Sequence, residues 1–110
     1  MIGSPEAVAT EIWAFGGRVM ADATDVSSLA EVDAIVAKIV SAFGQIDIVV
    51  NNAGNQRFLR FAGTTRADYD SLIDIHIGGS FNVTCAAWPH MAARGYRRVV
   101  FTTRQVGFYG

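Results

Sequence analysis

The sequence predicts an α/β protein built around a small parallel sheet. Apolar residues at helical spacing alternate with three short apolar runs, in the order α-β-α-β-α-β. Short buried strands joined by helices are typical of parallel sheets. Right-handed crossovers then bring the carboxyl ends of all strands to one edge, where ligands bind in open α/β sheets.

The first helix is predicted to begin at Ser4 and to end before Gly16. Ser4 is a good N-cap residue, and Pro5 suits the first helical position. Apolar residues follow at helical spacing: Val8, Ile12 and Phe15. The next run, "RVMAD" at residues 18–22, is short, apolar in its centre and bounded by turn formers, so we predict a strand there.

The second helix carries the clearest helical pattern in the chain. Ser28 and Glu31 have the spacing of a capping box, and the pattern ends at Gly44. One apolar stripe contains Leu29, Val32, Val36, Val40 and Phe43. "IDIVV", residues 46–50, is almost entirely apolar and β-branched, which predicts a strand covered by helices on both faces.

The last helix is predicted to be long, over residues 66–94. Thr65 and Asp68 form a second capping box, and apolar residues continue at helical spacing far beyond it. Pro89 is expected to kink or loosen this helix. "RRVVFTT", residues 97–103, is the third predicted strand.

Composition indicates a single domain, residues 1–110, with a modest core, since 51% of residues are hydrophobic and 17% are charged. The net charge is -1 and the arginines are scattered, so we expect no nucleic-acid partner. Cys85 is the only cysteine, which excludes an intramolecular disulfide and a cysteine-based metal cluster. No apolar run has membrane-spanning length, and we expect a cytoplasmic protein without membrane contact.

Candidate ligand-binding residues follow the predicted strands. They are Asp25 and Val26, then Asn52, Ala53 and Gly54, and finally Thr103 and Arg104. Gly54 has no Cβ, so a flat ligand could lie directly on its backbone. Two roles remain open for the polar residues. Asp25 and Asn52 either contact a ligand or satisfy a helix cap and a strand end without one.

Four segments in order resemble the short-chain dehydrogenase/reductase family. They are "DATDV", "FGQIDIVVNNAG", "DYDSLIDIHIGGSFNVTCAAWPHM" and "GYRRVVFTTRQVGFYG". The resemblance implies a Rossmann fold and hydride transfer between an alcohol or ketone and NAD or NADP. "IHIGGSF", "TCAAWPHM" and "GFYG" are most similar to the (R)-3-hydroxyacyl-CoA dehydrogenase type of the peroxisomal multifunctional enzyme and its bacterial relatives.

The resemblance also implies roles for single residues. Asp25 and Val26 match the pair beside the adenine ring, while Asn52, Ala53 and Gly54 match the segment lining the adenine ribose. His76 takes the position of an active-site Asn that supports a proton-relay water. Its place beside Leu72 and Ile73 also suits a buried core histidine.

Arg104 stands where the family has the serine that hydrogen-bonds the substrate carbonyl. Arginine is a permanent cation on a long stem, so it would fill that pocket, although it could bind an anion. The alternative is a surface arginine with no role in chemistry.

Other family features are missing from the 110 residues. They contain no T-G-x-x-x-G-x-G turn to receive a pyrophosphate, and no Tyr-x-x-x-Lys pair to protonate a substrate oxygen. We therefore predict a partial Rossmann fold that lacks the family's first two strands and its last, and that is inactive alone. The alternative function is a non-catalytic module, either self-associating or a degenerate nucleotide-binding remnant.

The missing strands also predict a gap in the sheet. In the order 3-2-1-4-5-6, residues 18–22 and 46–50 would be the third and fourth strands, separated by about 14 Å at a strand spacing of about 4.8 Å. We expect either that these two strands pair directly, giving a three-stranded parallel sheet with flanking helices, or that two chains associate. In the family the long helix forms a subunit interface, so we expect a homo-oligomer through residues 66–94, with Phe81, Trp88 and Met91 exposed on that helix.

Overall fold

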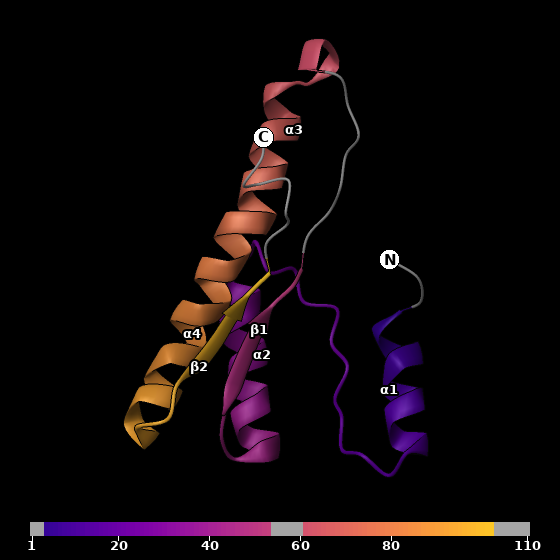
Figure 1. Cartoon of the computed structure of the whole chain (residues 1–110), viewed down its shortest axis with the longest axis vertical. Coiled ribbons are helices and arrows are strands. Elements are labelled where there is room, and N and C mark those ends of the chain that lie inside the picture. The colour runs from indigo at the N-terminus through magenta and orange to yellow at the C-terminus, as the bar shows by residue number, and fades with distance from the viewer. Residues whose placement is uncertain (1–3, 54–60, 103–110) are drawn as a thin grey trace.

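The computed structural model of the chain describes residues 4–53 and 61–102 (Figure 1). In chain order the elements are α1 (Pro5–Ala14), α2 (Leu29–Phe43), β1 (Ile48–Asn51), the 3₁₀ turn η1 (Phe61–Gly63), α3 (Arg66–Ile73), the π-helical turn η2 (Asp74–Gly78), α4 (Gly79–Arg94) and β2 (Arg98–Phe101).

The sheet of the described residues has two parallel strands, β1 and β2. Ile48 pairs with Arg98 and Asn51 with Phe101, and the ladder is extended by the Thr102 N–H, which donates to the Asn51 carbonyl at 3.0 Å. The predicted α/β class and the parallel pairing are confirmed. The predicted number of three strands is wrong.

Residues 18–22 make no strand pairing and run instead as a connection between α1 and α2. The Arg18 guanidinium lies 5.0 Å from the Phe43 ring and donates to the Ala42 carbonyl, and Lys38 pairs with Asp22 at 3.2 Å. A strand exists only as part of a ladder, and the strands expected beside this segment are not among the described residues. Direct closure of the gap by pairing with β1 is therefore also wrong.

The helix starts follow the predicted caps. The Ser4 hydroxyl accepts from the Ala7 N–H, and Thr65 and Asp68 satisfy each other's backbone N–H groups. Ser28 caps α2 by accepting from the Glu31 N–H, but the predicted capping box is not closed, because the Ser28 N–H donates to the Asp25 carbonyl at 3.0 Å and not to Glu31. The Glu31 carboxylate reaches the Asp25 N–H at 3.5 Å and so ties the approach to α2 in place.

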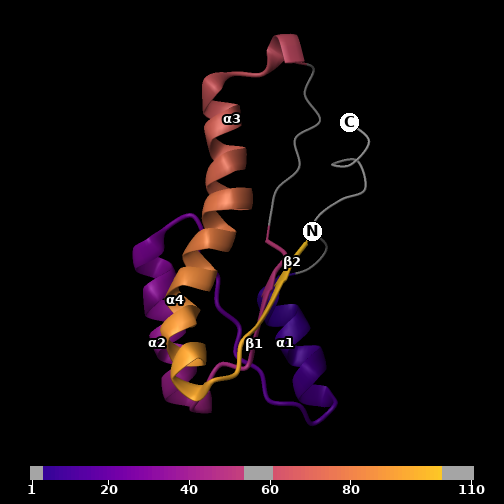
Figure 2. The ribbon, with the colours of Figure 1, turned by 60° about the vertical axis from the view of Figure 1, so that its left-hand side comes forward.

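The long predicted helix is continuous from α3 through η2 into α4, as Figures 1 and 2 show. It departs from α geometry at η2, whereas the prediction placed the departure at Pro89. Pro89 lies inside α4, which continues to Arg94 and ends at Gly95 in the left-handed conformation. Single π turns inside α-helices widen the helix locally and are frequent at functional sites.

The core lies on one face of the sheet, between β1 and the pair α2 and α4. Its buried residues are Val32, Val36, Ile46, Val49, Ala87 and Met91. Met91 is fully buried, so its predicted exposure on the long helix is wrong. The helical face that it shares with Ala87 packs on α2 and β1, which leaves other residues of α4 to face solvent.

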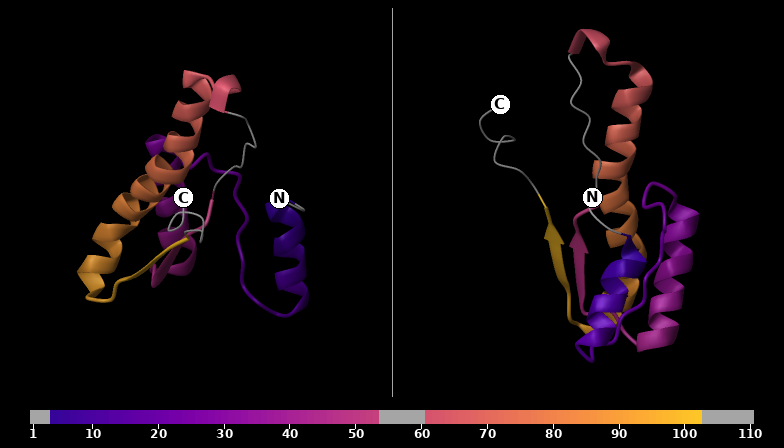
Figure 3. Two further views of the ribbon diagram at one scale, coloured as in Figure 1. Left: turned by 45° about the horizontal axis from the view of Figure 1, so that its top comes forward. Right: turned by 90° about the vertical axis from the view of Figure 1, so that its right-hand side faces the viewer.

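The opposite face of β1 is open. Ile48 and Val50 are 57% and 61% exposed, which contradicts the prediction of a strand covered on both faces. Figures 1 and 3 show α1 standing apart from the two strands at the far end of the extended connection. The radius of gyration, 16.0 Å, exceeds the roughly 13 Å of a compact domain of this length. Among the described residues no helix is long and apolar enough to cross a membrane.

Candidate functional site

A small cavity lies at the carboxyl end of β1, against the start of α4. Its volume is about 60 Å³, and it is lined by Val26, Val50, Asn51, Asn52, Ala53, Gly79, Ser80 and Val83. It thus brings together three of the predicted ligand-binding residues, Val26, Asn52 and Ala53, although Val26 is far from the other two in sequence. Two water molecules would fill this volume. The cavity alone is therefore too small to hold a nucleotide.

Val26 is held against the first turn of α4 by two contacts. The Asn82 side-chain amide donates to the Val26 carbonyl at 3.0 Å. A Cβ added to Gly79 would lie only 2.7 Å from Cγ2 of Val26, so the absence of a side chain at Gly79 permits the close approach. These two helix residues, which sequence reasoning missed, position Val26. The Gly-Gly pair in "IHIGGSF" was the available signal.

Asp25 is exposed and does not line the cavity. Its Oδ1 accepts from the Ser27 hydroxyl at 2.7 Å and from the Ser27 N–H at 3.0 Å. The bond from the Ser27 hydroxyl, and to a lesser extent the bond from its N–H, hold the pKa of the Asp25 carboxyl below its ordinary value. The group is therefore ionised at neutral pH. Asp25 is not the helix cap that the sequence allowed, because Ser28 is the N-cap of α2; its predicted contact with a ligand stays a prediction.

Asn51 is the buried polar residue of this region, at 9% exposure. Its side-chain amide donates to the Thr84 hydroxyl on α4 at 3.1 Å, and its carbonyl accepts from Thr102 beyond β2. Asn51 thus joins β1 to both neighbouring elements just before the predicted Asn52-Ala53 wall. The first asparagine of the Asn-Asn pair was the sequence signal for this role.

His76 lies in η2 and is exposed, so it is not the buried core histidine that the apolar pattern allowed. The π turn follows α3 and precedes the α4 residues that line the cavity. The backbone carbonyl of His76 accepts from the Ser80 hydroxyl at 3.2 Å. The predicted site residues Gly54 and Arg104 lie outside the described residues.

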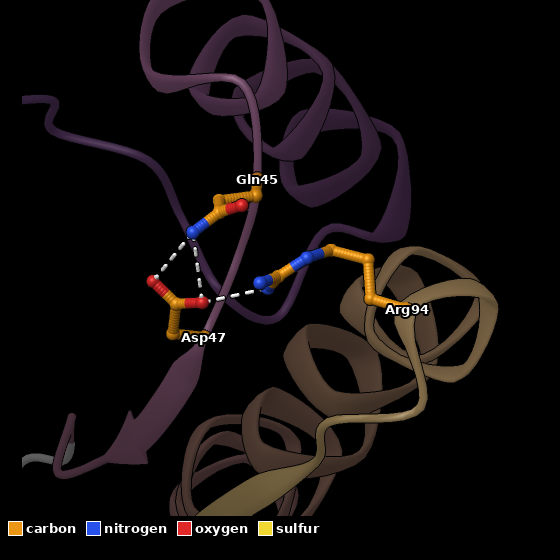
Figure 4. A network of polar contacts seen from close by, with 3 residues as sticks. All are labelled: Gln45, Asp47 and Arg94. Carbon is orange, nitrogen blue, oxygen red and sulfur yellow. Dashed lines mark hydrogen bonds and ion pairs between the residues drawn. The ribbon is translucent and has the colours of Figure 1, made fainter.

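A polar network lies before the other end of β1 (Figure 4). The Arg94 guanidinium contacts Asp47 Oδ1 at 2.6 Å, and the Gln45 amide donates to both carboxylate oxygens. The Arg94 guanidinium first, and the Gln45 amide to a lesser extent, hold the pKa of Asp47 below its ordinary value. The network ties the end of α4 to the approach to β1 and is structural.

Comparison with known proteins places this geometry in a family. The model of the short chain dehydrogenase family matches residues 3–110. The peroxisomal hydratase-dehydrogenase-epimerase of Neurospora crassa is 37% identical over 107 residues, which are 97% of this chain and 12% of that protein. The peroxisomal multifunctional enzyme type 2 of Mus musculus is 38% identical over 103 residues, 94% of this chain and 14% of that protein.

Two solved structures share the fold. A short-chain dehydrogenase from Streptomyces avermitilis superposes with a TM-score of 0.77 at 30% identity, covering 86% of this chain and 35% of that one. A metagenomic short-chain oxidoreductase in complex with NADP superposes with a TM-score of 0.79 at 29% identity, covering 86% of this chain and 43% of that one. This chain spans less than half the length of each of these relatives. The match along nearly all of its own length shows that it belongs to the short chain dehydrogenase family.

Proposed function

We propose that this chain forms the adenosine-side wall of the cofactor cleft of an NAD- or NADP-dependent oxidoreductase acting on alcohols and ketones. The observation that carries the proposal is the meeting of Val26 with Asn52 and Ala53 at the carboxyl end of β1. That edge is the ligand-binding edge of an open parallel sheet. The 3-hydroxyacyl-CoA class is the proposed substrate class, because the sequence segments around His76 resemble enzymes of that type.

The residues of the cavity suit a flat, partly polar group. Val26 offers an apolar surface, and Asn52 and Ala53 would follow the adenine ribose with short side chains. The resemblance adds Gly54, which would let the ribose lie directly on the backbone. Asp25 would accept a hydrogen bond from an exocyclic amine, because its ionised carboxylate has more acceptor positions than its two bonds to Ser27 occupy. A bound nicotinamide cofactor supplies the hydride chemistry.

We further propose that the 110 residues alone do not catalyse turnover. His76 is the proposed catalytic residue at the position of the family Asn, and Arg104 occupies the position of the family Ser, where it would not orient a neutral carbonyl in the same way. No tyrosine has a lysine four residues later, because Lys38 is the only lysine. The Tyr-x-x-x-Lys pair that protonates the substrate oxygen in the family is thus absent from these 110 residues.

Titration with NADH and NADPH tests the cofactor proposal, with intrinsic fluorescence of Trp13 and Trp88 as the readout. Saturable binding that is weakened by Val26→Asp and unchanged by Val8→Asp is expected, because Val8 is a half-exposed valine on α1 away from the cavity. No response at millimolar cofactor would overturn the proposed cleft. Turnover of a 3-hydroxyacyl-CoA by the purified chain would overturn the proposed inactivity.

Self-association through residues 66–94 is a second candidate function. An apolar groove of about 760 Å³ follows α4 and is lined by Ile77, Ser80, Phe81, Thr84, Cys85, Trp88, Pro89 and Phe101. Phe81 and Trp88 are 68% and 46% exposed in the isolated chain. Large exposed apolar patches mark interaction surfaces in soluble proteins.

The molar mass in solution tests this second function. Phe81→Glu is expected to shift a homo-oligomer toward monomer, whereas Phe61→Glu, at a 94% exposed phenylalanine outside the helix, is the matched control. A monomeric native chain at every concentration would refute self-association.

The cytoplasmic location expected from the sequence stays a prediction. The two relatives named above carry names that place those proteins in peroxisomes.

A further inference from the structure

The acidic and basic residues of this chain are unevenly distributed. All ten Asp and Glu residues lie at or before Asp74, whereas four arginines and no acidic residue follow it. Three of these arginines, Arg94, Arg97 and Arg98, fall within five positions, in the connection from α4 to β2. Charge asymmetry between two parts of a chain indicates a charged partner. This connection is therefore a candidate binding surface for an anionic partner.

The connection lies at the amino end of the sheet, away from the proposed cofactor cleft. Figure 1 shows α4 and β2 meeting at the end of the molecule where the two strands begin, whereas the candidate cavity is at the carboxyl end of β1. Residues 94–98 are exposed, and the elements on both sides of them are described in full. A partner bound here would leave the cavity free.

Arg94 has a structural role that accounts for its charge. It lies in the last turn of α4, where a cation is favourable beside the helix carbonyls, and its guanidinium pairs with Asp47 at 2.6 Å (Figure 4). Arg97 and Arg98 lack such a partner, because none of the ion pairs among the described residues includes either of them. Their positive charges are therefore available to another molecule.

Aromatic rings orient both of these guanidinium groups. The guanidinium carbon of Arg97 lies 5.3 Å from the centre of the Trp88 ring, and that of Arg98 lies 4.7 Å from the centre of the Tyr96 ring. Arg98 also donates to the Arg97 carbonyl at 2.8 Å, which leaves its other N–H groups unused. A guanidinium that rests on a ring is already restricted, so less conformational entropy is lost when its planar fork meets an anion.

The open shape of this surface favours an extended partner over a small anion. Neither Arg97 nor Arg98 lines the cavity at the carboxyl end of β1 or the groove along α4. Because they lie over different rings, they present two separate forks, each of which matches a carboxylate through two parallel hydrogen bonds. Anionic membranes are bound instead by clusters of roughly 4–8 Lys or Arg. Nucleic acids also require larger basic patches.

We propose that Arg97 and Arg98 bind an acidic segment of a second polypeptide through its Asp or Glu side chains. One carboxylate pairs with each guanidinium. Because both arginines are exposed, each pair contributes modestly, and the binding is weak and sensitive to salt. The contact attaches a partner to the amino end of the sheet and does not rest on the cofactor proposal.

Nuclear magnetic resonance titration of the 110-residue chain at low salt tests the proposal. The probe is a synthetic peptide of alternating Glu and Asp between glycine ends, and the same peptide with Gln and Asn is its control. The acidic peptide is expected to shift the amide signals of residues 94–98 and the indole N–H signal of Trp88, but not the signals of α3. Raising the salt from about 0.05 M to about 0.5 M should weaken binding several-fold. No shift at millimolar acidic peptide, or equal shifts with the neutral peptide, would overturn the proposal.

Arginine variants with a matched control sharpen the test. Arg97→Gln combined with Arg98→Gln should weaken peptide binding by about tenfold, since each exposed pair contributes up to roughly fivefold. Arg66→Gln is the control, because Arg66 is also an exposed arginine over a tyrosine ring but is paired with Asp70 on α3. Unchanged binding by the double variant, or equal weakening by the control, would overturn the proposal. If circular dichroism shows that the double variant is unfolded, the two single variants replace it, and unchanged binding by both overturns the proposal.

Other partners of this surface give different results. An oligonucleotide or a vesicle of anionic lipid that binds the chain more tightly than the acidic peptide would show that phosphate groups are the preferred anions. Shifts at residues 94–98 that grow with protein concentration without peptide would show a second copy there, with the acidic α3 supplying the carboxylates. Either result would overturn binding of an acidic segment from a different polypeptide.

Discussion

Gly79 and Gly78 are adjacent glycines that should respond to alanine in opposite ways. A Cβ at Gly79 would lie 2.7 Å from Cγ2 and 3.3 Å from Cβ of Val26, closer than a carbon contact allows. At Gly78 the nearest atom is the Ile73 carbonyl oxygen at 3.7 Å, an ordinary contact. Both glycines have helical backbone angles, so alanine strains neither backbone.

The expected free energies follow from two opposing effects. Replacing glycine by alanine inside a helix stabilises by up to about 1 kcal/mol. Overpacking a close contact costs about 1–3 kcal/mol, because Val26 is β-branched and its carbonyl is held by Asn82. Gly78→Ala should therefore raise the unfolding free energy by up to about 1 kcal/mol. Gly79→Ala should lower it by about 0–2 kcal/mol.

Urea unfolding followed by far-ultraviolet circular dichroism measures both variants against the native chain. We expect a difference between the two variants of about 1–3 kcal/mol, set by the steric cost alone. For a chain of this size, each 1 kcal/mol shifts Tm by about 4–8 °C. Equal stabilisation by both alanines would refute the packing of Val26 on α4, and with it the cavity wall that this packing builds.

Three further predictions concern the core, the polar network and a helix cap. Met91→Ala should lower the unfolding free energy by about 2–5 kcal/mol, since the side chain is fully buried, whereas Phe81→Ala should change the monomer little; equal effects in urea titrations would contradict the packing. The pKa of Asp47 is lowered in the folded chain, so its ion pair with Arg94 stabilises above the ordinary carboxyl pKa and this contribution is lost as pH falls through the lowered value. The urea concentration at half-unfolding should therefore decrease as the pH is lowered below about 5, and this decrease should be smaller in Arg94→Gln. Identical pH profiles of the two proteins would argue against the ion pair. Thr65→Ala should lower stability by about 1 kcal/mol through loss of the reciprocal cap, with faster amide exchange confined to the start of α3; uniform exchange changes would argue against a local role.

Helices and their boundaries were predictable because the signals are local. Ser4 and Thr65 cap helices through residues three positions away, and Gly44 ends α2 in the left-handed conformation that glycine adopts readily. The family was also accessible from sequence, because its segments occur in order along the chain. The parallel pairing of β1 and β2 followed from the helix between them.

The third strand and the exposure of single residues required the tertiary structure. The run at residues 18–22 has strand composition, yet pairing depends on a partner at strand spacing, and α2 holds this run away from β1. Periodicity showed that the long helix has an apolar face, but not that Met91 turns inward while Phe81 and Trp88 remain exposed.

The residues of the candidate site were also indicated in part by the sequence and in part only by the tertiary structure. The sequence by itself indicated Val26, Asn52 and Ala53 as residues that follow predicted strands, because strand ends in a parallel sheet share an edge, although the segment before Val26 forms no strand in the structure. The tertiary structure decided that Gly79 and Asn82 hold Val26 beside the other two, and that Asn51 joins β1 to α4. Val26 is 53 positions from Gly79 and 56 positions from Asn82. Contacts over such separations depend on how helices pack on the sheet, which local sequence signals do not specify.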